Sequence, residues 1–140
     1  MGQQQLLLII LGVIVVGIAV AVGITMFNDS AVSANRDAVT NDLVNLASRA
    51  QQYYRRPTAL GGGGGSFANL TAGSGMRLLT KTSGTSMMNG NGTYTISSTA
   101  PTQITLQGFG TETGNDGTNR VTVVMDVWPD SARVNTASTN

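Results

Sequence analysis

The fold is decided by the first stretch of the chain, MGQQQLLLIILGVIVVGIAVAVGITMF, which runs from Met1 to Phe27. Its last 22 residues, Leu6 to Phe27, include no charged residue. As an α-helix this segment is roughly 33 Å long at about 1.5 Å per residue, and the hydrocarbon core of a bilayer is about 30 Å thick. We therefore expect residues 1–27 to form an apolar half-helix that can span a membrane.

Three interpretations of this stretch are open: a cleaved secretion signal, a retained membrane anchor, and a surface that packs against copies of itself. A cleaved signal normally carries Lys or Arg before its apolar region, and residues 1–5 contain neither. Ala19-Val20-Ala21 does resemble a signal-peptidase site. The missing basic residues favour a segment that stays in the mature protein.

After Phe27 the pattern changes to that of an amphipathic helix. Charged and amide residues alternate with one apolar stripe at helical spacing, formed by Val32, Val39, Leu43, Leu46, Ala50 and Tyr53. No proline occurs before Pro57, which cannot continue a helix. The sequence predicts one helix from near Gln3 to near Arg55, whose second half is residues 28–56. A capped break at Asn28-Asp29-Ser30, giving two helices, is the alternative.

Residues 57–92 form a loop between the helix and the strands. Five consecutive glycines, Gly61 to Gly65, predict a flexible connection. They lack the Lys-Ser or Lys-Thr ending of a phosphate-binding loop. We expect the apolar residues of this loop to pack on the helix, namely Phe67, Leu70, Met76, Leu78 and Leu79.

The last part of the chain, residues 93–140, reads as an antiparallel sheet with a polar tail. Strands are predicted over 93–97, 103–107 and 121–128, with a turn at Ala100-Pro101 and another between Gly110 and Asn119. Residues 130–140 read as a tail or a short edge strand. The inward-facing side chains of the first two strands are expected to be Tyr94, Ile96, Ile104 and Leu106. The fold class is α+β: a long N-terminal helix whose C-terminal half packs on a small three- to four-stranded antiparallel sheet.

Composition excludes several classes of function. Eight basic and seven acidic residues give a net charge of +1 with no basic run, so nucleic acid is not an expected partner. The chain has no Cys and no His, which removes disulfides, the usual zinc sites and histidine general bases. The spacing of Glu112, Asn115 and Asp116 matches no calcium loop. We expect no catalytic residues, no metal and no cofactor, and we expect that the protein is not an enzyme.

The stretch QQQLLLIILGVIVVGIAVAVGI, followed by an amphipathic helix, a loop and strands, resembles the type IV pilins and the related pseudopilins. The resemblance implies a pilin-like fold whose apolar half-helix lies in the inner, cytoplasmic membrane before assembly and in the core of an extracellular filament afterwards. It implies a structural subunit whose partners are copies of itself, the membrane and the pilus assembly machinery. The alternative function is a minor pseudopilin, or a membrane-anchored binding module, of a secretion or uptake apparatus.

The chain departs from the family pattern in three ways. Family precursors carry a short basic leader that ends in Gly, whereas Met1-Gly2 precedes the glutamines here. If Met1 is the mature start, the position of the family's glutamate falls at Gln5, which offers only a neutral hydrogen bond to a neighbouring subunit. The helix-breaking proline of the family's core segment is also missing, which favours a continuous helix.

Two sets of candidate site residues follow. Glycines in the apolar segment let neighbouring backbones approach, and the large side chains around them supply contact area. We expect the assembly interface to use Met1, Gln5, Leu6, Leu7, Ile10, Gly12, Ile14, Gly17, Val20, Ile24 and Phe27. Acceptor patterns for asparagine glycosylation place candidate modification sites in the loops at Asn69 and Asn91.

Overall fold

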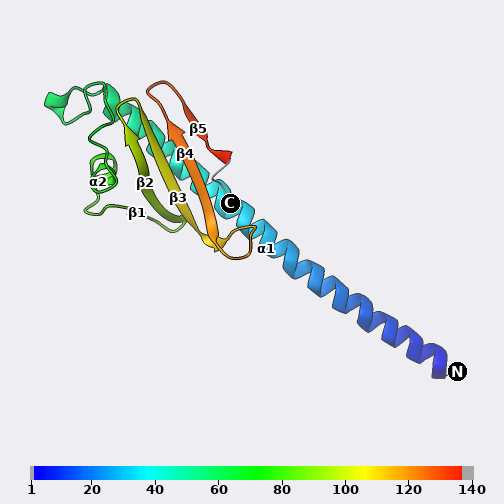
Figure 1. Cartoon of the computed structure of the whole chain (residues 1–140). Coiled ribbons are helices and arrows are strands. Elements are labelled where there is room, and N and C mark those ends of the chain that lie inside the picture. Colours follow the sequence, from blue (N-terminus) through cyan, green and yellow to red (C-terminus); the bar gives the residue numbers. More distant parts are fainter. Residues whose placement is uncertain (1, 137–140) are drawn as a thin grey trace.

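The computed structural model describes residues 2–136 and begins with one uninterrupted α-helix, α1 (Gly2–Arg55). The helix passes through residues 28–30 without a break, so the prediction of a single helix is confirmed and the two-helix alternative is wrong. Its first half projects from the folded body as a bare rod, and its second half lies against a sheet (Figure 1). Residues 2–27 and 28–55 therefore belong to one continuous helix but have different surroundings.

The sheet has five antiparallel strands in the order β1-β2-β3-β4-β5. Three are long: β2 (Gly92–Ala100), β3 (Gln103–Thr113) and β4 (Arg120–Val127). The edge strands are the two-residue β1 (Met87–Met88) and β5 (Ala132–Val134). The α+β class is confirmed. The sheet has one strand more than expected because β1 pairs across only Tyr94 and Thr93, a length too short to produce an alternating pattern.

The core lies between the second half of α1 and one face of this sheet. The predicted helical stripe is buried, apart from Val32, which is half-buried at its edge. The predicted inward side chains of β2 and β3 are also buried. Strand β4 contributes more buried apolar side chains than any other strand. The strand residues buried in this core are Tyr94, Ile96, Ile104, Leu106, Val121, Val123, Met125 and Val127.

Two glycines of β3 allow the helix to come close to the sheet. A Cβ atom on Gly108 would lie 2.6 Å from Cγ1 of Val39, and a Cβ atom on Gly110 would collide with the side chain of Asn35. In both cases the added Cβ atom would be closer than van der Waals contact allows. Glycine at these positions sets the spacing between α1 and the middle of the sheet.

The loop between helix and sheet is more ordered than the sequence predicts. The loop contains two short helices, η1 (Thr58–Leu60) and α2 (Gly75–Thr80). Its glycine run folds back on the end of α1. The N–H groups of Gly63 and Gly65 donate to the carbonyls of Tyr53 and Tyr54, both at 2.8 Å. These bonds satisfy carbonyls that a helix end leaves without partners. The run connects helix and sheet as expected, and it also forms a hydrogen-bonded cap on the end of α1.

Four of the five apolar loop residues pack as expected. Phe67, Leu70, Met76 and Leu79 are buried, whereas Leu78 is 43% exposed. In a helix as short as α2, residues three apart share a face, so burial of Met76 and Leu79 turns Leu78 towards solvent.

Candidate functional site

The strongest functional feature is the apolar rod, defined as residues 6–27 of α1. Its sixteen large apolar side chains are each between 49% and 79% exposed. The helix is long and apolar enough to cross a membrane, and none of its most apolar window is buried within the chain. A surface of this kind is normally covered by lipid or by other protein.

The rod contains most of the predicted assembly interface. Met1 lies outside the described residues, and every other predicted interface residue is exposed: Gln5, Leu6, Leu7, Ile10, Gly12, Ile14, Gly17, Val20, Ile24 and Phe27. At about 100° per residue these positions cover an arc of about 220° and leave one side of the helix without a predicted interface residue. The isolated chain does not bring them together, because they are spread along one helix.

The free energy available from covering the rod is large. Burying a large aliphatic or aromatic side chain completely is worth about 1.5–3 kcal/mol. Sixteen such side chains at about 60% exposure then provide roughly 15–30 kcal/mol, before the cost of association is subtracted. The one hydroxyl of the rod, on Thr25 near its C-terminal end, donates to the carbonyl of Val22 at 2.8 Å and so needs no water.

A polar cluster locks α1 to the beginning of β2. One carboxylate oxygen of Asp42 accepts hydrogen bonds from the hydroxyl of Tyr94 at 2.6 Å, from Nδ2 of Asn89 at 2.8 Å and from Nδ2 of Asn91 at 2.9 Å. Burial alone raises the pKa of Asp42, but the three hydrogen bonds outweigh it and hold the pKa below its usual value. Burial, followed by the bond to Asp42, raises the pKa of Tyr94 well above its usual value.

Asn35 makes a second tie between α1 and the sheet. Its Oδ1 accepts from the backbone N–H of Thr111 at 3.1 Å, and its Nδ2 donates to the carbonyl of Asn91 at 3.0 Å. Asn35 therefore joins the helix to the end of β3 and to the loop before β2. Sequence analysis missed both ties, since their partners lie 47 to 77 residues apart.

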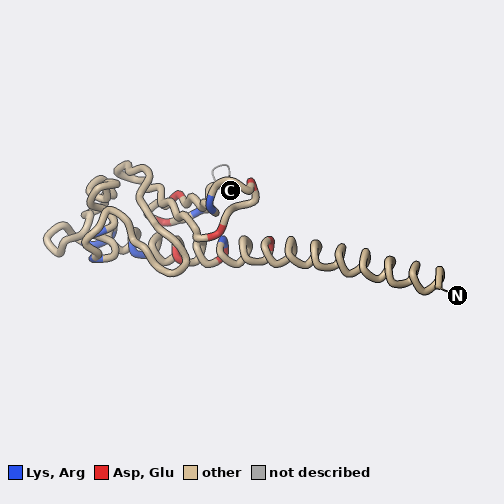
Figure 2. Tube along the Cα trace, turned by 90° about the horizontal axis from the view of Figure 1, so that it is seen from below, with Lys and Arg blue, Asp and Glu red and all other residues tan. Residues whose placement is uncertain are grey.

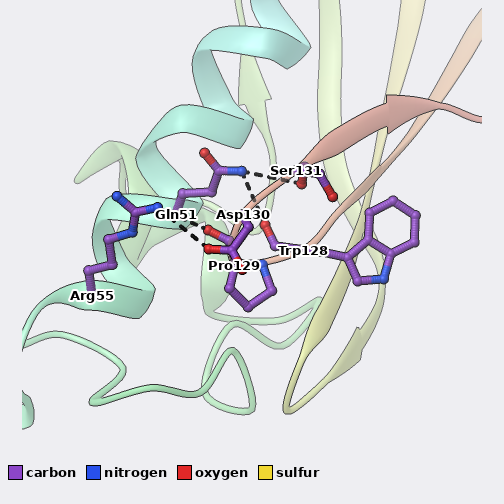
Figure 3. Close-up of polar contacts among 6 residues, drawn as sticks. All are labelled: Gln51, Arg55, Trp128, Pro129, Asp130 and Ser131. Carbon is purple, nitrogen blue, oxygen red and sulfur yellow. Dashed lines mark hydrogen bonds and ion pairs between the residues drawn. The ribbon is translucent and has the colours of Figure 1, made fainter.

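A third tie holds the turn between β4 and β5 to the far end of α1 (Figure 3). Nε2 of Gln51 donates to the carbonyls of Trp128 at 3.1 Å and Ser131 at 3.2 Å. Arg55 reaches the carbonyl of Pro129 at 3.4 Å and the carboxylate of Asp130 at 3.8 Å. The sheet is thus fastened to the helix near both of its edges.

No family model, curated protein or solved structure matches this chain.

The two candidate glycosylation sites differ in exposure and in hydrogen bonding. Asn69 is exposed in the loop before α2. Asn91 is half-buried, and its Nδ2, the atom that would carry a glycan, already donates to Asp42. Asn69 is the accessible site of the two, and Asn91 has a structural role that its acceptor pattern did not reveal.

The acidic side chains of the body do not converge. Within residues 2–136 no group of three acidic residues is placed to hold a metal ion.

Proposed function

We propose that this chain is the structural subunit of an extracellular, type IV pilus-like filament and that it polymerises through the apolar rod. Before assembly the rod holds the subunit in the cytoplasmic membrane, and during assembly it exchanges lipid for the rods of neighbouring copies. The observation that carries this proposal is a 22-residue segment, exposed on all sides, within the same helix that forms the core of the body.

The rigid connection favours a filament over a simple anchor. An anchor needs only about 20 apolar residues and tolerates any linker to its domain. Here the helix runs without a break from the rod into the packed stripe that begins at Val32. Each copy therefore presents its rod at the same angle to its body, which regular helical packing requires and anchoring does not.

The composition of the rod suits close packing of identical helices. A Cβ atom added to Gly12, Gly17 or Gly23 would meet nothing within 4 Å, so these glycines are not needed for packing within the chain. They remove side-chain bulk where neighbouring backbones would approach. Gln5 is uncharged, so it can enter such an interface at a lower desolvation cost than an acid. Shape and neutral hydrogen bonds would then set the contacts between rods.

Shearing tests this proposal directly. Filaments sheared from producing cells should be visible by electron microscopy, and mass spectrometry should identify this chain as their main component. The same spectrum reports the mature amino terminus and any glycan mass. Trace amounts in abundant filaments would instead support a minor pseudopilin, and retention of all the chain in the membrane would support an anchored binding module.

A further inference from the structure

The charges of the body are divided between its two ends. The distal end, farthest from the rod, carries five basic residues and one acid, a net charge of +4; these are Arg49, Arg55, Arg56, Arg77, Lys81 and Asp130. The proximal end, next to the rod, carries five acids and two arginines, a net charge of −3; these are Asp29, Arg36, Asp37, Asp42, Glu112, Asp116 and Arg120. Figure 2 shows a group of blue residues towards the end of α1, and red residues with a few blue ones among them nearer the rod.

The distal charges are available for an external partner. Among residues 2–136 the one ion pair within 4 Å is Arg55–Asp130 at 3.8 Å, and both of its side chains are largely exposed. Arg49, Arg56 and Lys81 are exposed and line a hollow of about 230 Å³ beside Leu78 and Leu79. The body therefore offers a positively charged, partly apolar concave surface with no acidic residue of its own in it.

The lengths of the two helix halves determine what can reach this surface in a filament. The body half of α1, residues 32–55, is roughly 36 Å long, and the rod is roughly 33 Å long. If a second copy is displaced by one body length along the helix axis, its rod lies level with the first body and abuts the first rod. The apolar column stays continuous, and the proximal end of the second body meets the distal end of the first.

We infer that the distal basic end of each copy binds the proximal acidic end of the copy one body length farther along the filament. The inference rests on the proposed function and adds what sets the axial stagger. The rod cannot set it by charge, because residues 6–27 have none and Gln5 is neutral. Charges are screened over about 8 Å at physiological ionic strength, so the +4 and −3 ends attract only when the bodies are stacked closely.

Cross-linking tests the contact without altering any charge. Because the chain has no Cys, Ala59→Cys at the exposed distal tip and Thr113→Cys at the exposed proximal end introduce the only thiols. A short bis-maleimide added to sheared filaments of the double variant should give a ladder of dimers, trimers and longer oligomers. Each single variant should stay monomeric. The matched control, Ala59→Cys with Ala132→Cys on the exposed edge strand, should give no ladder.

Charge reversal tests the energetics in the same full-length chain. Arg49→Glu, Arg56→Glu and Lys81→Glu together change the distal end from +4 to −2 and should lower filament yield at least tenfold. Adding Asp29→Lys, Asp37→Lys and Glu112→Lys changes the proximal end from −3 to +3 and should restore most of the yield. Wild-type filaments should also release subunits faster in high salt. Restoration by the second set of substitutions is not expected of a variant that merely misfolds.

The outcomes separate this inference from the proposed function. If wild-type filaments form, no ladder from the double-cysteine variant together with charge-reversed variants that keep filament yield within twofold of wild type would overturn the stacking contact and leave the filament standing. If reversal spares filament yield but abolishes retention on a heparin column, the hollow is a polyanion site, which also overturns it. A wild-type chain that forms no filaments overturns both.

Discussion

A single charge placed at the middle of the rod should abolish assembly while leaving the subunit folded and inserted in the membrane. Gly17 lies 11 residues after Leu6 and 10 before Phe27, so it is roughly 16 Å from either end of the rod. Gly17→Asp adds a carboxylate and removes no apolar area. Nothing lies within 4 Å of the added Cβ atom, so the body should fold unchanged.

The magnitudes separate insertion from assembly. An aspartate at the centre of a membrane helix costs about 2.5–3.5 kcal/mol, whereas sixteen large apolar residues contribute at most about −5 to −10 kcal/mol. Insertion of the variant therefore remains favourable. On assembly the carboxylate moves from the lipid bilayer, where water can reach it through local defects, into a dry filament core, and it loses that hydration. Every copy in the core carries the same buried charge without a partner of opposite sign. A penalty of about 3 kcal/mol per subunit is a factor of roughly 150 in the assembly constant.

The assay compares filament and membrane pools of the same culture. Sheared filaments of Gly17→Asp should fall more than a hundredfold below wild type, while the membrane fraction keeps a protease-resistant body. Gly73→Asp, the same substitution at an exposed loop glycine with open space around it, should assemble normally. Ile14→Asp should behave as Gly17→Asp does. Filament yield of Gly17→Asp within twofold of wild type would refute the packing of rods in a filament core.

Three further predictions concern the body. Asp42→Ala should lower the free energy of unfolding by about 1–3 kcal/mol at neutral pH, because it leaves three donors without their acceptor. Since the folded pKa of Asp42 lies below its usual value of 3.8, its stabilising contribution is complete above that pH and is lost as the pH falls through the folded pKa. Thermal melts from neutral to strongly acidic pH should therefore converge for wild type and variant, and parallel curves would contradict the assigned role. Gly108→Ala should cost about 1–3 kcal/mol in denaturant unfolding because its methyl group meets Val39, whereas Gly73→Ala should be nearly neutral. Gly63→Ala should expose the end of α1 to faster amide hydrogen exchange, since the added methyl group would collide with a neighbouring backbone oxygen; unchanged exchange would show that the cap is dispensable.

Features that depend on local periodicity could be predicted from the sequence. The helix, its stripe and the three long strands repeat a simple pattern over many residues, so Val39, Leu43, Ile104 and Leu106 were placed correctly. The exposed rod was predictable for the same reason. Its residues are apolar at every helical angle, and the expected sheet has too little surface to cover them.

Features that depend on contacts between distant segments were not predictable. Asp42, Asn89 and Asn91 look like ordinary surface residues until the fold brings the beginning of β2 against α1. The glycine run has the composition of a flexible linker, and only the carbonyls at the end of α1 make it a cap. Strand β1 is too short to have a pattern at all.

The three polar ties explain how the body could hold the rod in one rotational orientation. At about 100° per residue, Asn35 and Asp42 lie on one flank of the stripe centred on Val39, and Gln51 lies on the other flank, with Arg55 farther round on the same side. The first flank is bonded near β1 and β2 and the second to the turn between β4 and β5, which are opposite edges of the sheet. An apolar stripe alone lets a helix roll, because apolar contact has no direction. Ties on both flanks oppose rotation of the helix about its own axis in both directions. Each side of the rod therefore keeps a fixed orientation relative to the charged ends of the body. Identical copies could then meet through the same rod faces and the same body ends at once.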